Sequence, residues 1–196
     1  MLRGACVMVG LAACGKGSPS TQPAAADIGV PVPRVTVADL PAIDPSAVTI
    51  VATSSGIAMD GKALIAIDHG AVDPSEIQGG SLGYALPRLT HFADALAGAH
   101  AEQGIARDTV QVAIDPSLSY RVLEEVVFST KQSFPRATLL VRTTDGPRAI
   151  PIALASPSTN ATVSLAETLP AQPAADRIAA AYAAHPGVVV LGIGGD

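Results

Sequence analysis

Hydrophobic and polar residues alternate in the stretch VTIVATSSGIAMDGKALIAI, residues 48–67. Strict alternation over several residues is typical of a strand with one buried face. The run breaks at Ser54-Ser55-Gly56, and Asp60-Gly61 supplies the left-handed backbone that a tight hairpin turn requires. The pattern therefore predicts two or three antiparallel strands in this stretch.

The hydrophobic period becomes helical between residues 86 and 103. One stripe of the helical wheel carries Leu86, Leu89, Phe92, Ala93, Leu96 and Ala97. Pro87 suits a first helical turn, and Gly104 ends the pattern. A strand is predicted next, at residues 109–114.

A second helix is predicted at residues 120–133, before a strand at residues 137–143. One side of this helix carries Val122, Leu123, Val126, Val127, Thr130 and Phe134. The other side carries Arg121, Glu124, Glu125, Lys131 and Gln132, which we expect to face solvent. Phe128 falls among these polar residues and is a candidate binding residue. Either another chain covers its ring or a C-terminal helix with Ile178 and Tyr182 does, and we favour the helix.

The candidate chemistry lies where strand gives way to helix, in AIDPSLSY at residues 113–120. Asp115 ends the strand and Tyr120 opens the helix, and both are candidate binding residues. Ser117 or Ser119 with Asp115 and a distant histidine would be the parts of a hydrolase. However, the chain has no G-x-S-x-G or H-E-x-x-H motif, and capping of the helix by Ser117 or Ser119 explains these residues structurally. We therefore expect no catalytic residues.

Two segments leave alternatives open. Residues 147–196 predict two strands, a helix at residues 174–184 and a strand at residues 188–191. They are either additions to the first sheet or a truncated second copy of the main domain. The loop at residues 68–84 has Gly, Pro or Asp at every second or third position, and such long loops are either functional or irregular excursions.

The first residues have the pattern of a lipoprotein signal peptide. Arg3 precedes a short apolar segment that ends in Leu-Ala-Ala-Cys at residues 11–14. Residues 1–13 are then the signal peptide, and Cys14 is the lipidated residue. Removal of Cys6 with the signal peptide leaves no disulfide. The lipid would be the membrane anchor, because the segment is too short to span a bilayer.

Residues 14–46 are rich in proline and alanine, which predicts a tether. The short run at residues 34–37 could pair with a sheet edge. Gly15 after the cysteine favours the outer membrane, with the protein on the periplasmic face of a bacterial membrane.

Composition excludes other classes. The chain has 12 basic and 17 acidic residues and no basic stripe, which argues against nucleic-acid binding. His91 and His100 fall on different sides of the first helix, and Asp68-His69 is an isolated pair. We therefore expect no metal site and no cofactor.

The order strand, Asp-Gly hairpin, strand, helix, strand, AIDPSLSYRVLEEVVFSTKQSF and final strand resembles the periplasmic domain of the ExbD/TolR family of biopolymer-transport accessory proteins. In that family an acidic residue ends the third main strand and a tyrosine opens the next helix, as Asp115 and Tyr120 do here. The resemblance covers about residues 48–143. It implies that residues 47–146 form an α+β, two-layer domain with a mixed sheet and helices packed on one face.

ExbD and TolR also carry a transmembrane helix with an aspartate that takes part in ion flow, and this chain has the lipoprotein motif in its place. The resemblance therefore implies a fold and a binding role without proton translocation. We expect a lipid-anchored, non-catalytic binding or scaffold protein of the cell envelope. Its partner would be a motor-complex protein, peptidoglycan or a second copy in a homodimer. The alternative is an envelope hydrolase that uses Ser, Asp and His groups around residues 115–120.

Overall fold

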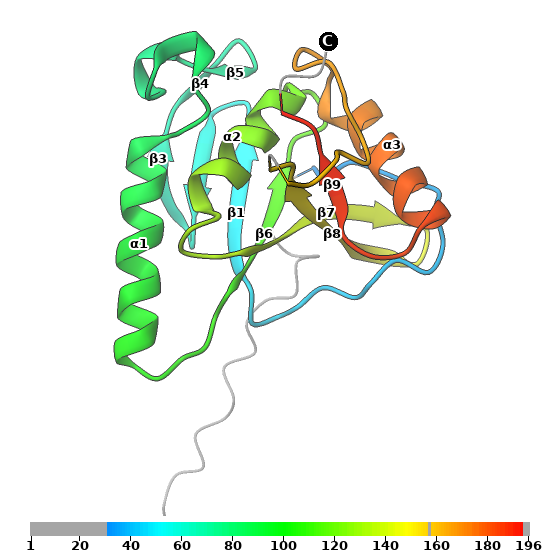
Figure 1. Ribbon diagram of the computed structural model, residues 1–196, viewed down its shortest axis with the longest axis horizontal. Coiled ribbons are helices and arrows are strands. Elements are labelled where there is room, and N and C mark those ends of the chain that lie inside the picture. Colours follow the sequence, from blue (N-terminus) through cyan, green and yellow to red (C-terminus); the bar gives the residue numbers. More distant parts are fainter. Residues whose placement is uncertain (1–30, 157, 194–196) are drawn as a thin grey trace, which may run out of the picture.

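The computed structural model describes residues 31–156 and 158–193 and shows an α+β fold built on a mixed seven-stranded sheet (Figure 1). Across the sheet the order is β3-β2-β1-β6-β7-β8-β9. These strands are β1 Val48–Thr53, β2 Gly56–Met59, β3 Lys62–Ile65, β6 Thr109–Ile114, β7 Arg136–Thr143, β8 Gly146–Leu154 and β9 Val189–Leu191. The α+β class and the mixed sheet expected from the sequence are confirmed. The signal peptide and Cys14 lie outside the described residues.

The sheet combines antiparallel hairpins with parallel crossovers. β1, β2 and β3 form an antiparallel meander, and β7 and β8 form a second hairpin. β6 lies parallel to both β1 and β7, and β9 lies parallel to β8. Asp60 and Gly61 have φ of 50° and 78°, the left-handed values that the two-residue turn between β2 and β3 requires.

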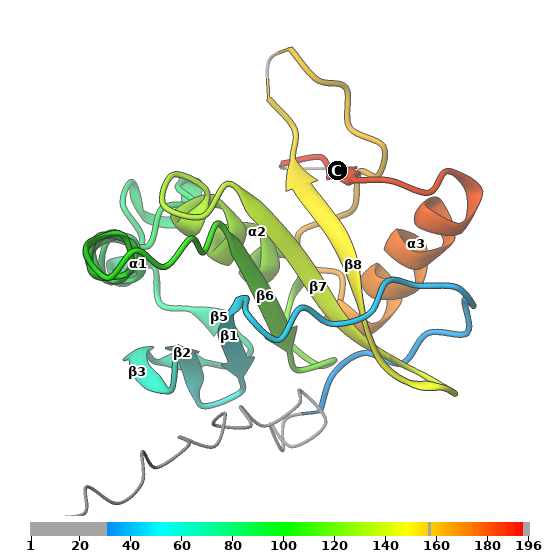
Figure 2. The same ribbon diagram turned by 90° about the horizontal axis from the view of Figure 1, so that it is seen from below.

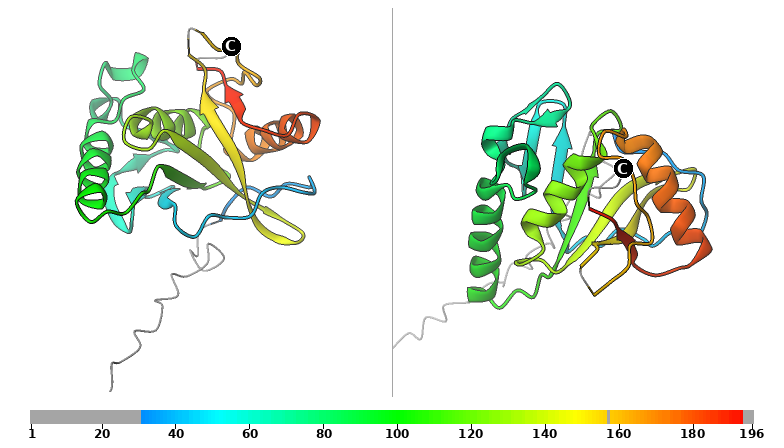
Figure 3. Two further views of the ribbon diagram at one scale, coloured as in Figure 1. Left: turned by 60° about the horizontal axis from the view of Figure 1, so that its bottom comes forward. Right: turned by 45° about the horizontal axis from the view of Figure 1, so that its top comes forward.

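Three helices pack against one face of the sheet: α1 Pro87–Glu102, α2 Tyr120–Thr130 and α3 Ala171–Ala184 (Figure 3). Alternate residues of the central strands point into this layer, as the buried Val48, Ile50 and Ala52 of β1 do. α2 contacts both α1 and α3 (Figure 1). It is therefore the central helix of the layer, and all its residues are buried except Arg121 and Phe128, which are partly exposed.

The segment of residues 31–46 bonds to the end of β7 and then crosses the opposite face of the sheet, where Figure 2 shows it running over β8, β7 and β6. Val35 and Leu40 of this segment are buried in the main core. Val32 and Ile43 pack on a small second core formed by Ala113, Leu140 and Ala149. This part of the expected tether therefore lies against the folded body.

Residues 147–191 extend the same sheet. β8 and β9 are its outer strands, and Ile178 of α3 is fully buried in the main core. Of the two strands expected before α3, the first is β8, but the second is absent from the described residues: a single bridge pairs Val163 with Leu191 in its place. α3 begins at Ala171, three residues earlier than its pattern predicted.

The loop at residues 68–84 is folded onto itself. It contains most of the small ladder of β4 Ile67–Asp68 and β5 Ala71–Val72, followed by the 3-10 turns Pro74–Glu76 and Gly80–Leu82. A Cβ atom at Gly83 would lie 1.9 Å from the carbonyl oxygen of Gln78, so only glycine fits this close approach. Val72 and Ile77 are buried and fix the loop to the core.

Candidate functional site

Asp115 closes a local turn at the end of β6. Its Oδ1 accepts hydrogen bonds from the backbone amide of Ser117 at 2.9 Å and from the Ser117 hydroxyl at 2.7 Å. Its own amide donates to the carbonyl of Ala52 at 2.8 Å, which holds the turn against β1. These contacts are those of an aspartate turn, in which the carboxylate satisfies the backbone two residues on.

The N-terminus of α2 is capped by another part of the chain. Ser119 is the N-cap residue, but its side chain makes no capping hydrogen bond, so the predicted serine cap was wrong. The amide of Tyr120 donates to the carbonyl of Leu169 at 2.7 Å, and the amide of Arg121 donates to the carbonyl of Glu167 at 3.1 Å. The free amides of the first turn are therefore satisfied by a loop that follows in sequence by more than 40 residues.

The parts of the alternative hydrolase are not assembled. His69 lies in the loop whose Gly70 carbonyl accepts a hydrogen bond from the Ser119 amide. Its side chain is 95% exposed, and its Nε2 lies 3.6 Å from the carboxylate of Asp68. Within the described residues no hydrogen bond joins a serine to a histidine. The Ser117 hydroxyl donates directly to Asp115, and no base stands between the two.

The face of α2 that was expected to meet solvent is buried, and that expectation was wrong. Glu124 and Glu125 have relative exposures of 0% and 1%. Arg121 bonds Glu125 at 2.8 Å, the carbonyl of Gly83 at 2.6 Å and the carboxylate of Glu167. One guanidinium therefore joins α2, the 68–84 loop and the segment before α3. We call Arg121, Glu125, Glu167, Tyr84 and Glu124 the Arg121 cluster.

The Arg121 cluster holds more carboxylates than cations. Burial and the charge of Glu167 raise the pKa of Glu124 to about 8, against an opposing effect of Arg121. Both carboxyl oxygens of Glu124 are buried without a hydrogen-bond partner among the described residues. The hydrogen bond from the Tyr84 hydroxyl, with that from Arg121, lowers the pKa of Glu167. The arrangement keeps Glu167 ionised and Glu124 protonated near neutral pH.

Tyr120 also belongs to this region. It is fully buried. Burial, followed by the nearby Glu124, raises the pKa of its hydroxyl, which is buried without a partner within residues 31–156 and 158–193. Tyr120 is therefore a core residue whose hydroxyl is close enough to the Arg121 cluster for Glu124 to affect its pKa.

Phe128 lies at the wall of a cleft between α1 and α2. Its ring packs against Tyr84 with ring centroids 6.2 Å apart, and the ammonium of Lys131 lies 4.0 Å from the ring centroid. The expected cover by Ile178 and Tyr182 was wrong: the aromatic partner comes from the 68–84 loop on the α1 side of the helix.

The cleft has a volume of about 310 Å³. Phe128 supplies its aromatic wall, and the polar side chains on its lining are Gln78, Thr90, His91, Ser129, Lys131 and Gln132. Neither side-chain amide has a hydrogen-bond partner among the described residues, which leaves donors and acceptors open beside an aromatic ring. Sequence periodicity identified Phe128, but the glutamine at position 78 comes from a loop that no periodicity places.

Comparison with models of known protein families gives no match. Searches among curated proteins and among solved structures find no match either. In the described part of the chain, none of the helices has the length and apolar character needed to cross a membrane.

Proposed function

We propose that this protein is a lipid-anchored binding or scaffold protein of the cell envelope, similar to the periplasmic domain of the ExbD/TolR family and without catalytic activity. Cys14 carries the lipid and holds the protein on the periplasmic face of a bacterial membrane, the outer membrane being favoured. Peptidoglycan is the partner that the α1–α2 cleft fits best. A motor-complex protein and a second copy of the chain are the other partners that an experiment must distinguish.

The composition of the cleft supports this proposal. A sugar ring presents C–H groups on its faces and hydroxyl groups around its edge, so it is bound by an aromatic ring flanked by side-chain amides and hydroxyls. Phe128, Gln78, Gln132 and Thr90 provide this combination on one lining. Lys131 adds a positive charge for the carboxylates of a peptide stem, and it sits on a flexible side chain that can move off the ring.

The state of the titratable side chains supports a binding protein rather than an enzyme. The carboxylate of Asp115 already accepts hydrogen bonds within its own turn, and the Arg121 guanidinium already donates to three acceptors. Glu124 has a shifted pKa, but its carboxyl oxygens are fully buried and cannot reach a substrate. A general acid must lie within hydrogen-bond reach of the reacting group, so this carboxyl serves the fold.

Co-sedimentation of the full-length, detergent-solubilised protein with purified peptidoglycan sacculi tests the proposal. We expect the parent protein to sediment with sacculi and Phe128→Ala to bind about fivefold more weakly, because an aromatic contact contributes on the order of 1 kcal/mol. Val188→Ala is the matched control, since Val188 is 58% exposed and lies outside the cleft. Circular dichroism of each variant verifies the fold.

Two other outcomes would redirect the proposal. A parent protein that stays in the supernatant, but crosslinks to a motor subunit in membranes, would identify the motor complex as the partner. A parent protein that sediments as a dimer in ultracentrifugation, and becomes monomeric in Phe128→Ala, would identify the cleft as an interface between copies. Equal sacculus binding by Phe128→Ala and the parent would reject the cleft as the glycan site.

A further inference from the structure

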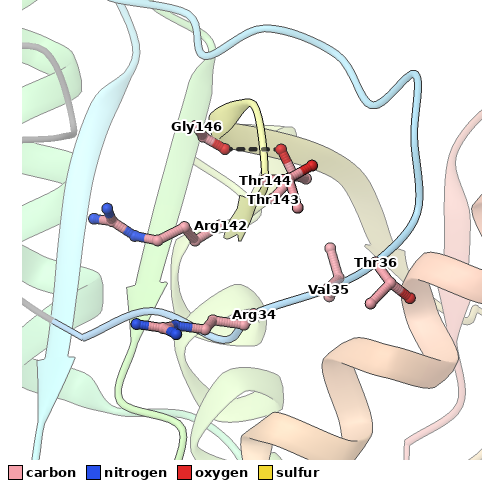
Figure 4. A pocket seen from close by; sticks show the side chains of 7 residues that line it. All are labelled: Arg34, Val35, Thr36, Arg142, Thr143, Thr144 and Gly146. Carbon is pink, nitrogen blue, oxygen red and sulfur yellow. Dashed lines mark hydrogen bonds between the residues drawn. The ribbon is translucent and has the colours of Figure 1, made fainter.

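Arg34 and Arg142 are paired residues on the face of the sheet opposite the helices. An isolated parallel bridge joins Arg34 of the N-terminal segment to Arg142 at the end of β7. Residues paired across neighbouring strands project to the same face, so the two side chains lie next to each other. Figure 4 shows the two guanidinium groups extending to the same side, away from Val35 and Thr36.

The backbone around Arg34 is held on two sides. The amide of Val35 donates to the carbonyl of Arg142 at 3.0 Å, and the amide of Arg142 donates to the carbonyl of Pro33 at 2.8 Å. On the other side, Gln172 of α3 accepts from the Arg34 amide at 3.0 Å and donates to the Arg34 carbonyl at 2.7 Å. Gln172 thus bonds Arg34 as a neighbouring strand would. The position of Arg34 beside Arg142 is therefore determined by four hydrogen bonds.

The two arginines have no acidic partner among the described residues. Arg88, Arg121 and Arg136 form ion pairs, whereas Arg34 and Arg142, like Arg107, Arg148 and Arg177, form none in the described residues. Of these five, only Arg34 and Arg142 are paired with each other across neighbouring strands. Like charges directly opposite each other on neighbouring strands are destabilising. An open cleft of about 490 Å³ adjoins the two residues, and Val35 and Thr36 line it on the side that the guanidinium groups point away from. The local charge is thus +2 on a chain whose net charge is −5.

We propose that the Arg34–Arg142 pair binds a phosphate group. A phosphate carries close to two negative charges at neutral pH and offers several acceptor oxygens, so one group can neutralise both guanidinium ions, which a single carboxylate cannot. Because Arg34 belongs to the N-terminal segment and Arg142 to β7, the bound phosphate also fastens that segment to the sheet. The group comes either from free phosphate or from the headgroup of an anionic phospholipid.

Thermal unfolding of the full-length protein in 20 mM phosphate, against chloride of equal ionic strength, tests the site. We expect phosphate to raise the melting temperature by about 2–5 °C, since a ligand that binds only the native state stabilises it. Arg34→Gln and Arg142→Gln should each abolish the rise. Arg177→Gln should keep it, because Arg177 is exposed, lies on α3 and makes no ion pair in the described part of the chain. Retention of the rise in both test variants would overturn the proposal.

Trypsin cleavage after Arg34 gives a second readout. Cleavage requires residues 33–35 to leave the sheet, so phosphate should slow it at least threefold in the parent and not in Arg142→Gln, which keeps the cleavage site. Flotation with vesicles of phosphatidylglycerol, against phosphatidylcholine, identifies the source of the phosphate. Protection by free phosphate, or an Arg142-dependent preference for phosphatidylglycerol, supports the site. The absence of both overturns it.

Discussion

Arg121 and Glu167 are 46 positions apart in the sequence and form an ion pair over the start of α2. The same carboxylate accepts a hydrogen bond from the Tyr84 hydroxyl, and the backbone carbonyl of Glu167 caps the amide of Arg121. One residue therefore fastens the segment before α3 to the central helix through its side chain and its backbone together.

Glu167→Gln should lower the free energy of unfolding by about 1–3 kcal/mol, because it leaves the partly buried Arg121 guanidinium with one carboxylate fewer. Urea denaturation measures the loss. Glu76→Gln removes the same charge from the exposed ion pair with Arg88, 3.3 Å long, and should cost less than about 0.5 kcal/mol. Equal losses in the two variants would show that the Arg121 cluster contributes no more than a surface pair.

Glu124→Gln should change how stability depends on pH. Burial raises the pKa of Glu124 to about 8 from 4.5, so between these values the native state holds a proton that the unfolded state lacks. The contribution of Glu124 is therefore fully present below pH 4.5 and is lost as pH rises towards 8. Glutamine mimics the protonated acid at every pH. At pH 8 the variant should be more stable than the parent by about 1–3 kcal/mol.

Melting temperatures of both proteins between pH 5 and 9 measure this difference. The neighbouring titratable groups are Glu125, Glu167, Tyr84 and Tyr120, and all are retained in the variant. The difference between the two curves thus isolates Glu124. Parallel curves would mean that this carboxyl is ionised in the native state throughout the range.

Asp115→Asn should be nearly neutral. The asparagine oxygen can accept the same two hydrogen bonds from Ser117, so we expect a melting temperature within about 2 °C of the parent. Asp115→Ala removes the acceptor and should cost about 0.5–1.5 kcal/mol. Calorimetry of the two variants compares them. A loss of partner binding in Asp115→Asn, at unchanged stability, would assign this carboxylate a direct role in recognition.

Cys14→Ala should abolish membrane anchoring. Without the thiol there is no site for the lipid, and several acyl chains are needed for a stable anchor. Phase partitioning in detergent should move the variant from the detergent phase to the aqueous phase, and its signal peptide should remain uncut by the lipoprotein peptidase. Unchanged partitioning would reject Cys14 as the lipidated residue.

Local pattern was sufficient for most helices and strands. Residues 109–114 alternate and are flanked by turn residues, and β6 has these bounds. The Asp60-Gly61 turn was likewise predicted, because few residue pairs adopt its backbone. Both features depend only on residues that are close together in the sequence, so they can be predicted from the sequence alone.

The Arg121 cluster is formed by contacts between segments far apart in sequence. The helical pattern of α2 alone therefore gave a wrong prediction of which side faces solvent. Glu124 and Glu125 have the chemistry of a solvent-facing helix surface, and Arg121 precedes Glu125 by one helical turn, as in many exposed pairs. Nothing in these spacings shows that Tyr84 and Glu167 cover them. The same reason explains Ser119, whose expected capping role is taken by backbone carbonyls that have no sequence signature.

The docking of residues 33–35 on β7 and Gln172 determines how far the folded body can travel from the bilayer. With Cys14 as the proposed anchor, eighteen residues lie between it and Pro33. Whatever path they take, they can span at most about 65 Å. If residues 33–46 detach, the span grows to as much as about 115 Å, because 32 residues then precede Ala47. Detachment of residues 33–46 would break these hydrogen bonds and expose Val35 and Leu40, which are buried in the main core. Whether this segment stays docked therefore sets which of two distances from the membrane the folded body can reach, and so where it can meet a partner.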